Sequence, residues 1–440
     1  MLRMILVLIV FGVGTVAGLQ SAVLASCFFI WNDTFRPAEW AYYHGILRPE
    51  TFKAVHIATA VLALSLFIRP WKRRWNGVAT AMVVFLGWVF VCALTSQLRE
   101  IGMEKAVTTA KYMIPLAFIS ATLCTRSAQH LFLYTLAASV GIWMVHHGVN
   151  AILANEPEIH MAIRGGQMSD RNDFMVAGTA CIPMILYIGF QYEGRARKWV
   201  RLLAKVGAVF SAGALFFSLS RGAVLGFTAL LLWYAVSTGR FFRRLFTVVA
   251  VIGLLVLVMP KFVWERMSTI EVSEDQTETS ATNRLIHMKT AIDVTLDYPL
   301  TGVGPSNFPY VSSRYSVFNA EPHSLWLKCS SEYGLPMLVF FLLLVGRLIF
   351  RLRATATAAK LRGDRQTEAL ATTLSCALFG FLATGSFTSQ FLSEYMWAII
   401  GLIGAFLATP ILHPAPEAGP SGEESPALRA GGKPLALPRA

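Results

Sequence analysis

Apolar runs long enough to cross a membrane recur along the whole chain, and they constrain its fold more than any other feature. A bilayer core of about 30 Å requires about 20 apolar residues in a helix, because only a segment with internal backbone hydrogen bonds is stable there. Of the 440 residues, 55% are hydrophobic and 14% are charged, whereas soluble domains carry about 25% charged residues. The sequence therefore predicts an all-α polytopic membrane protein.

About twelve transmembrane helices are expected. The first apolar run is longer than a signal-peptide core of about 7–15 residues and lacks a small-residue cleavage pattern, so we expect it to be retained as a span. Its Gly14 and Gly18 leave open a broken pair of short helices. The predicted spans are residues 4–31, 53–69, 76–96, 108–124, 130–153, 174–191, 202–219, 222–237, 245–259, 334–350, 369–389 and 394–412.

Short basic loops separate alternate spans and predict the topology. With twelve spans, the Lys- and Arg-rich segments 69–74, 195–201, 240–244 and 351–365 all fall on one side, which the positive-inside rule assigns to the cytoplasm. Both termini are then cytoplasmic. The opposite side receives residues 32–52, 97–107, 154–173, 220–222, 261–322 and 390–393. The net charge of +13 is explained by these loops, so we expect no nucleic-acid partner.

Three parts of the chain follow from this topology. Residues 1–412 form a transmembrane domain, residues 261–322 form a large periplasmic loop within it, and residues 413–440 form a cytoplasmic tail. The tail is rich in Pro, Gly and Ala and has few large apolar residues, so it is predicted to be disordered.

The large loop is expected to contain a helix that lies on the bilayer. Ser280 is a plausible N-cap, and Pro299 ends the helix. Gly302 and Gly304 then permit a tight turn that folds back toward the membrane. After Ala281, apolar positions recur at helical spacing: Leu285, Met288, Ile292 and Leu296.

Two arginines near the predicted outer surface have two interpretations each. Arg221 interrupts an apolar stretch, where Gly222 is expected to supply a sharp reversal; it is either an interfacial side chain or an anion ligand, since an ionisable group near membrane depth tends to be functional. Arg284, near the start of the loop helix, is either a solvated charge or a phosphate donor beside a helix N-terminus.

Arg164 and Arg171 lie in a Gly-containing loop on the same predicted side, where pairing with Asp170 or Asp173 is the alternative role for each. His323 follows Pro322 directly at the entrance to the next span. A lone histidine is usually structural, but an imidazole with a pKa near 6.5 also suits proton abstraction from a hydroxyl at neutral pH.

No metal site or cofactor is expected. The acidic pairs Glu156/Glu158, Asp170/Asp173 and Glu274/Asp275 are separate in the sequence, whereas hard cations require clustered oxygen ligands. Arginines can neutralise a diphosphate without a metal. The six cysteines lack metal-site spacing and are expected to be small buried hydrophobes.

Several short motifs follow one another in the second half of the chain. They are Ser220-Arg221-Gly222-Ala223, Thr282-Asn283-Arg284, the Gly-Val-Gly-Pro-Ser-Asn-Phe segment 302–308, His323-Ser324-Leu325-Trp326, and Ser331-Glu332-Tyr333-Gly334-Leu335. In this order they resemble the O-antigen ligase and polymerase superfamily over roughly residues 170–412. The segment 30–37 is similar to ligase-like proteins found beside exosortase systems.

The resemblance implies a metal-independent glycosyltransferase of the GT-C type in the inner membrane of a Gram-negative bacterium, with its active site facing the periplasm. The donor would be a glycan on undecaprenyl diphosphate and the acceptor a lipid A–core sugar hydroxyl. His323 would be the catalytic histidine. Arg221 and Arg284 would be diphosphate ligands, with Arg164 or Arg171 as a third. A single displacement would invert the anomeric carbon.

Other functions remain open. An O-antigen-type polymerase and a protein O-glycan ligase would share these motifs and differ in the acceptor. A transporter of lipids or solutes is a different class that also fits twelve spans. The sequence shows no matching halves of the kind that transporters tend to contain.

Overall fold

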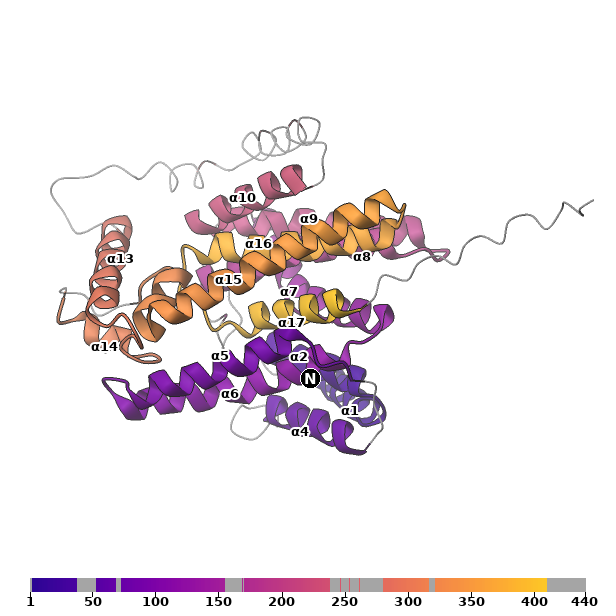
Figure 1. Ribbon diagram of the computed structural model, residues 1–440. Helices are drawn as coiled ribbons and strands as arrows, with labels where there is room; N and C mark the ends of the chain where they lie inside the picture. Colours follow the sequence, from indigo (N-terminus) through magenta and orange to yellow (C-terminus); the bar gives the residue numbers. More distant parts are fainter. Residues whose placement is uncertain are drawn as a thin grey trace, which may run out of the picture. The chain divides into compact units, whose positions relative to one another are not determined.

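Apolar segments form long helices in the computed structural model (Figure 1), which describes residues 2–37, 53–68, 73–154, 168, 170–237, 246, 253, 261, 280–315 and 321–409. All regular structure in this part of the chain is helical. Residues 1–409 form one compact unit. The predicted tail lies outside the described residues. The helices are α1 (Leu2–Gln20), α2 (Ala22–Thr34), α4 (Ala54–Ile68), α5 (Gly77–Leu94), α6 (Arg99–Thr122), α7 (Arg126–Ala154), α8 (Arg171–Gln191), α9 (Arg197–Phe217), α10 (Arg221–Ser237), α13 (Ser280–Asp297), α14 (Phe308–Ser312), α15 (Leu325–Leu361), α16 (Arg365–Gly385) and α17 (Glu394–Ala408).

Seven of the described helices are long and apolar enough to cross a membrane: α1, α5, α7, α8, α9, α15 and α16. Three more, α4, α10 and α17, are apolar but shorter. The protein is therefore a multi-pass helical membrane protein. The total of twelve spans stays a prediction, because the segment 245–259 lies outside the described residues except for two isolated positions.

Two predicted spans illustrate how the structure differs from the sequence pattern. The run 4–31 is two helices, α1 and α2, which meet at Ser21 in extended conformation, so the open alternative of a broken pair is the observed one. The span predicted to begin at residue 108 is longer, since α6 begins at Arg99. The first turns of this helix contain charged residues such as Glu100 and Lys105. These residues lower the local hydropathy, so the pattern places the start of the helix too late.

An aromatic core joins α5, α15 and α17. The ring of Trp397 lies 4.4 Å from that of Phe85 and 6.0 Å from that of Phe341, measured between centroids, and Phe391 packs edge-on against Phe341 at 5.1 Å. All four side chains are fully buried. Around this core α8 and α16, the most buried of the candidate spans, lie side by side (Figure 1).

The helix ends form two groups. At one end, Arg74 Nη1 donates to the Ala408 carbonyl at 2.6 Å and Gln129 Nε2 donates to Thr409 Oγ1 at 2.8 Å, which joins the starts of α5 and α7 to the end of α17. At the other end, the backbone N–H of Gln97 donates to the Val303 carbonyl at 3.0 Å. The loop after α13 thus belongs to the same end as the α5–α6 connection.

Helix α13 is present as predicted, but its apolar row does not face the protein. Leu285, Ile292 and Leu296 are 67%, 48% and 68% exposed, while the opposite face, including His287 and Val294, is buried. An exposed apolar stripe on a helix at the end of a membrane bundle is the pattern of an interfacial helix. The position of α13 on the bilayer surface stays a prediction.

Candidate functional site

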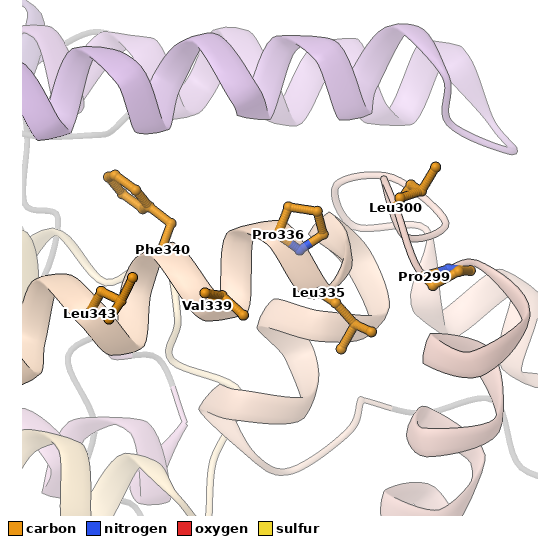
Figure 2. Close-up of a pocket in the computed structure, with 7 residues that line it drawn as sticks. All are labelled: Pro299, Leu300, Leu335, Pro336, Val339, Phe340 and Leu343. Carbon is orange, nitrogen blue, oxygen red and sulfur yellow. The ribbon is translucent and has the colours of Figure 1, made fainter.

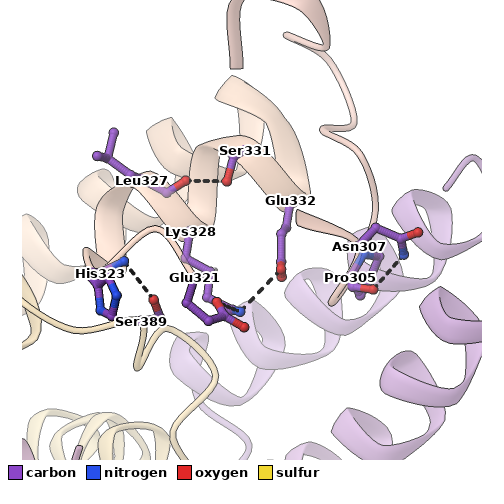
Figure 3. A network of polar contacts seen from close by, with 9 residues as sticks. All are labelled: Pro305, Asn307, Glu321, His323, Leu327, Lys328, Ser331, Glu332 and Ser389. Atoms are coloured by element: carbon purple, nitrogen blue, oxygen red, sulfur yellow. Dashed lines mark hydrogen bonds and ion pairs between the residues drawn. The ribbon is translucent and has the colours of Figure 1, made fainter. Parts of the chain in front are cut away.

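His323 has an unusual backbone conformation just before the start of α15. Its φ is 51°, a left-handed value that is uncommon for a residue with a side chain and often found at functional sites. Its backbone N–H donates to Ser389 Oγ at 3.0 Å (Figure 3). Three residues later, Trp326 Nε1 donates to Ser386 Oγ at 2.9 Å. The α16–α17 turn therefore fixes the start of α15.

The imidazole of His323 faces α13. Its ring is stacked on that of His287, with centroids 5.6 Å apart and 24° between the ring planes. Burial is the largest cause that lowers the pKa of His323, followed by the positive charges of Arg284 and His287, while Glu321 and Asp170 act in the opposite direction. The ring is therefore neutral at pH 7 and able to accept a proton.

Arg284 reaches this histidine from the second turn of α13. It is half-buried and interacts electrostatically with His323, three residues before His287 on the same helix. Positions three apart in an α-helix share a face, so both side chains are directed toward His323. The structure thus brings together two of the predicted site residues, Arg284 and His323.

Arg221 begins α10 at the same end of the bundle. The preceding residue, Ser220, donates through its hydroxyl to Asn172 Oδ1 at 2.8 Å. On the other flank, a Cβ added to Gly222 would lie 2.7 Å from Phe387 Cβ, in the turn that holds His323. Arg221 is thereby placed among the elements that surround His323.

The reversal before α10 is formed differently from the prediction. Leu219, not Gly222, has the left-handed conformation, with a φ of 54°. Gly222 is instead required for the close approach of α10 to Phe387. The sequence correctly indicated a turn and a glycine beside it, but the predicted role of Gly222 was wrong. Close packing between distant segments leaves no local sequence pattern.

Of the remaining two predicted arginines, the structure describes Arg171 but not Arg164. Arg171 is the first residue of α8, directly after the N-cap Asp170, whose carboxylate accepts the Asn172 N–H at 2.7 Å. Asp170 interacts electrostatically with His323, so Arg171 lies beside a site residue. Arg164 lies outside the described residues.

A buried ionic network underlies His323 and was not anticipated. Lys328 Nζ lies 2.5 Å from Glu321 Oε2 and 3.2 Å from Glu332 Oε1 (Figure 3). Lys328 is buried and Glu332 is fully buried, so neither charge is solvated and each depends on the other. Two opposite charges four residues apart within an apolar run were the available sequence signal.

The loop after α13 is joined to a kink in α15. Gly334 interrupts α15 with φ 81° and ψ 171°. The freed backbone groups pair with the loop: Leu335 N–H donates to the Pro299 carbonyl at 2.7 Å, and Val303 N–H donates to the Ser331 carbonyl at 2.9 Å. A Cβ at Gly334 would lie 2.0 Å from the Leu300 oxygen. The predicted fold-back at 299–304 is thus a close backbone contact.

An apolar groove of about 600 Å³ lies beside this kink (Figure 2). Its walls come from the loop after α13 and from the α15 surface beyond Gly334. The lining residues are Pro299, Leu300, Leu335, Pro336, Val339, Phe340 and Leu343.

Among the described residues, no group of three or more His, Cys, Asp or Glu side chains is arranged to hold a metal ion. Of the predicted acidic pairs, only Asp170 and Asp173 lie in the described part. All six cysteines are unbonded to one another, and all but the half-buried Cys124 are buried.

Comparison with known proteins gives two family matches. Residues 206–342 match the family described as O-antigen ligase, and residues 1–190 match a family of unknown function. No curated protein matches the chain. The first match includes Arg221, Arg284 and His323, together with Lys328 and the kink at Gly334.

Proposed function

Because this chain belongs to the O-antigen ligase superfamily through residues 206–342, we propose that it transfers an O-antigen-type glycan from undecaprenyl diphosphate to a sugar hydroxyl of lipid A–core. The site faces the periplasm, and the protein is a GT-C-type enzyme of the inner membrane of a Gram-negative bacterium. The observation that carries the proposal is the position of the Arg284 side chain near the His323 imidazole.

This pair suits a displacement at an anomeric carbon. The acceptor hydroxyl gives its proton to the His323 ring as its oxygen attacks the anomeric carbon. The bond from that carbon to the diphosphate oxygen breaks, and the lipid diphosphate leaves with the bonding electrons. A single displacement inverts the carbon. General-base assistance of this kind typically contributes about 10²–10⁴-fold in rate.

The leaving group gains negative charge, which fixed cations stabilise most as it develops. Arg284 and Arg221 are the proposed diphosphate ligands, since guanidinium groups bind phosphate oxygens in a bidentate manner. Arg171 and Arg164 are further candidates. The balance of charge needs no metal ion in this proposal.

The apolar groove beside Gly334 supports a lipid-linked donor. Its lining is entirely aliphatic or aromatic apart from prolines, so it suits an isoprenoid chain. Leu335 lies twelve residues after His323, a distance of roughly 18 Å along a helix at 1.5 Å per residue, which a long polyprenyl chain spans easily.

The test uses the full-length protein in liposomes, with a polyprenyl-diphosphate-linked glycan as donor, a lipid A–core acceptor, and no ion gradient. We expect transfer by the wild type and by Lys289→Ala, a change at an exposed position on α13. His323→Ala and Arg284→Ala should abolish transfer while the protein stays folded and inserted. Full activity of both variants would reject the site.

The same system separates the alternatives. Transfer between two lipids without a gradient is not transport, so a positive result excludes a transporter as the explanation. A deletion strain that accumulates lipid-linked polymer indicates a ligase, whereas one that accumulates single repeats indicates a polymerase. A protein O-glycan ligase would modify a polypeptide acceptor in place of lipid A–core.

A further inference from the structure

His287 lies against the proposed base, although no sequence motif selects it. It is 6% exposed and belongs to the buried face of α13. Its ring is stacked on the His323 ring at 5.6 Å. Aromatic pairs at this separation contribute stabilisation beyond the area that they bury, which favours one ring orientation.

The helix that carries His287 is itself firmly attached. Thr295 Oγ1 and Ser330 Oγ are hydrogen-bonded at 2.9 Å, which joins α13 to the first part of α15. Further along, Tyr315 donates to Asp297 Oδ2 at 2.6 Å. A small apolar cluster closes the contact, formed by Ala291, Val294, Val303, Phe308 and Val311. The His287 ring is therefore a fixed surface for His323.

A general base needs such a surface because its accepting nitrogen must point toward the acceptor hydroxyl. The Ser389 hydrogen bond fixes the backbone of His323, and stacking on one face opposes rotation of the ring about its Cβ–Cγ bond. That arrangement keeps the ring edge, which carries both nitrogens, available to a hydroxyl. Four ionisable groups interact electrostatically with the ring: Arg284 and His287 from α13, Glu321 from its own segment, and Asp170 from the start of α8.

We propose that His287 is a positioning residue for the transfer reaction, which holds the His323 imidazole in its productive orientation by ring stacking. This inference rests on the proposed function. His287 makes no contact with the reacting atoms in the proposal; it acts through His323.

The electrostatics of the pair give the proposal a specific signature. Burial and the His287 charge both lower the pKa of His323, and burial also lowers the pKa of His287. The wild-type rate should therefore stay constant down to a pH below 6.5 and fall only as His323 becomes protonated. Removing His287 raises the pKa of His323, so the acidic fall in rate moves to higher pH.

The experiment compares His287→Ala and His287→Phe with Thr290→Val, a buried control one turn along α13. The alanine variant should lose about two- to ten-fold in kcat, the range that corresponds to the energy of one ring pair, with KM for the donor unchanged. The phenylalanine variant keeps a stacked ring and should recover most of the rate. Both should shift the acidic limb upward, the alanine variant further because it also exposes His323.

A second measurement does not depend on turnover. The His323 ring resonance of labelled full-length protein in nanodiscs, titrated by NMR, should report a higher pKa in both variants. If His287→Phe loses as much rate as His287→Ala, or if neither titration differs from the wild type, the positioning role is wrong. If the wild type fails to transfer glycan, the proposed function falls, while the titration still decides whether His287 controls the His323 ring.

Discussion

Lys328 balances the charges of two acidic side chains close to His323 in the chain. It lies between Glu321, which is partly exposed, and Glu332, which is fully buried. Replacement by Met removes the cation and leaves the Glu332 carboxyl buried without a compensating positive charge. Breaking a buried ion pair from one side typically costs about 3–5 kcal/mol. We expect Lys328→Met to lower Tm of the purified protein in detergent markedly.

The matched comparison is the double variant Lys328→Met/Glu332→Gln. A neutral amide does not carry the charge that makes Glu332 costly to bury, so the double variant should recover part of the lost Tm. Glu332→Gln alone should be milder than Lys328→Met, because Lys328 keeps Glu321. Additive effects of the two single changes would show that the two side chains do not interact energetically.

For single residues, the sequence identified candidate site residues better than it identified which side chains contact one another. Arg284 and His323, selected from motifs, do lie together. No local pattern selects His287, because its partner is 36 positions away in the chain and stacking across that separation leaves no trace in the sequence. The burial of Lys328 could not be predicted for the same reason, since only its contacts show whether a lysine is an interfacial or a buried charge.

Among the helices, α15 shows most directly how a glycine shapes the site. At Gly334 the backbone values of φ 81° and ψ 171° belong to a region that is essentially restricted to glycine and costs other residues about 1–3 kcal/mol. An added Cβ would also collide with the Leu300 oxygen. Gly334→Ala should therefore lower Tm and displace the 299–304 loop, with loss of transfer.

Gly346 supplies the control within the same helix. A Cβ there meets no atom within 4 Å, and alanine favours a helix over glycine by about 1 kcal/mol. Gly346→Ala should leave Tm and transfer unchanged or slightly improved. Equal losses of Tm and transfer in the two variants would mean that α15 tolerates alanine at neither glycine. The kink at Gly334 would then have no specific role.

The elements also show where hydropathy stops being informative. It correctly located the start of the continuous apolar part of α15 at Gly334, and it located α13 from a row of apolar positions. It could not show that α15 begins nine residues earlier, at Leu325, since that first part carries Lys328 and Glu332. It also could not show that the apolar row of α13 faces away from the protein, because periodicity shows which residues share a helix face but not what that face contacts.

For the molecule as a whole, the two groups of helix ends decide which compartment the site faces. One group contains Arg99 and the α14 residue Tyr310. The other contains the α8–α9 connection, since Tyr187 near the end of α8 is hydrogen-bonded to His130 near the start of α7, and the α15–α16 connection, since Asp364 interacts electrostatically with Arg126. The second group carries the basic loops, so the positive-inside rule assigns it to the cytoplasm. His323 would then face the periplasm with the first group.

Cysteine labelling tests this assignment in spheroplasts, in a background with Cys124→Ser. Arg99→Cys and Tyr310→Cys should react with a membrane-impermeant maleimide from outside. Arg195→Cys and Arg362→Cys, also at exposed positions, should react only after permeabilisation, since the bilayer separates them from the reagent. Complete reversal would place His323 in the cytoplasm, where a periplasmic acceptor could not reach it. Different labelling of positions 99 and 310 would instead contradict the grouping of helix ends, because the hydrogen bonds that connect α5–α6 to the loop after α13 require one side for both.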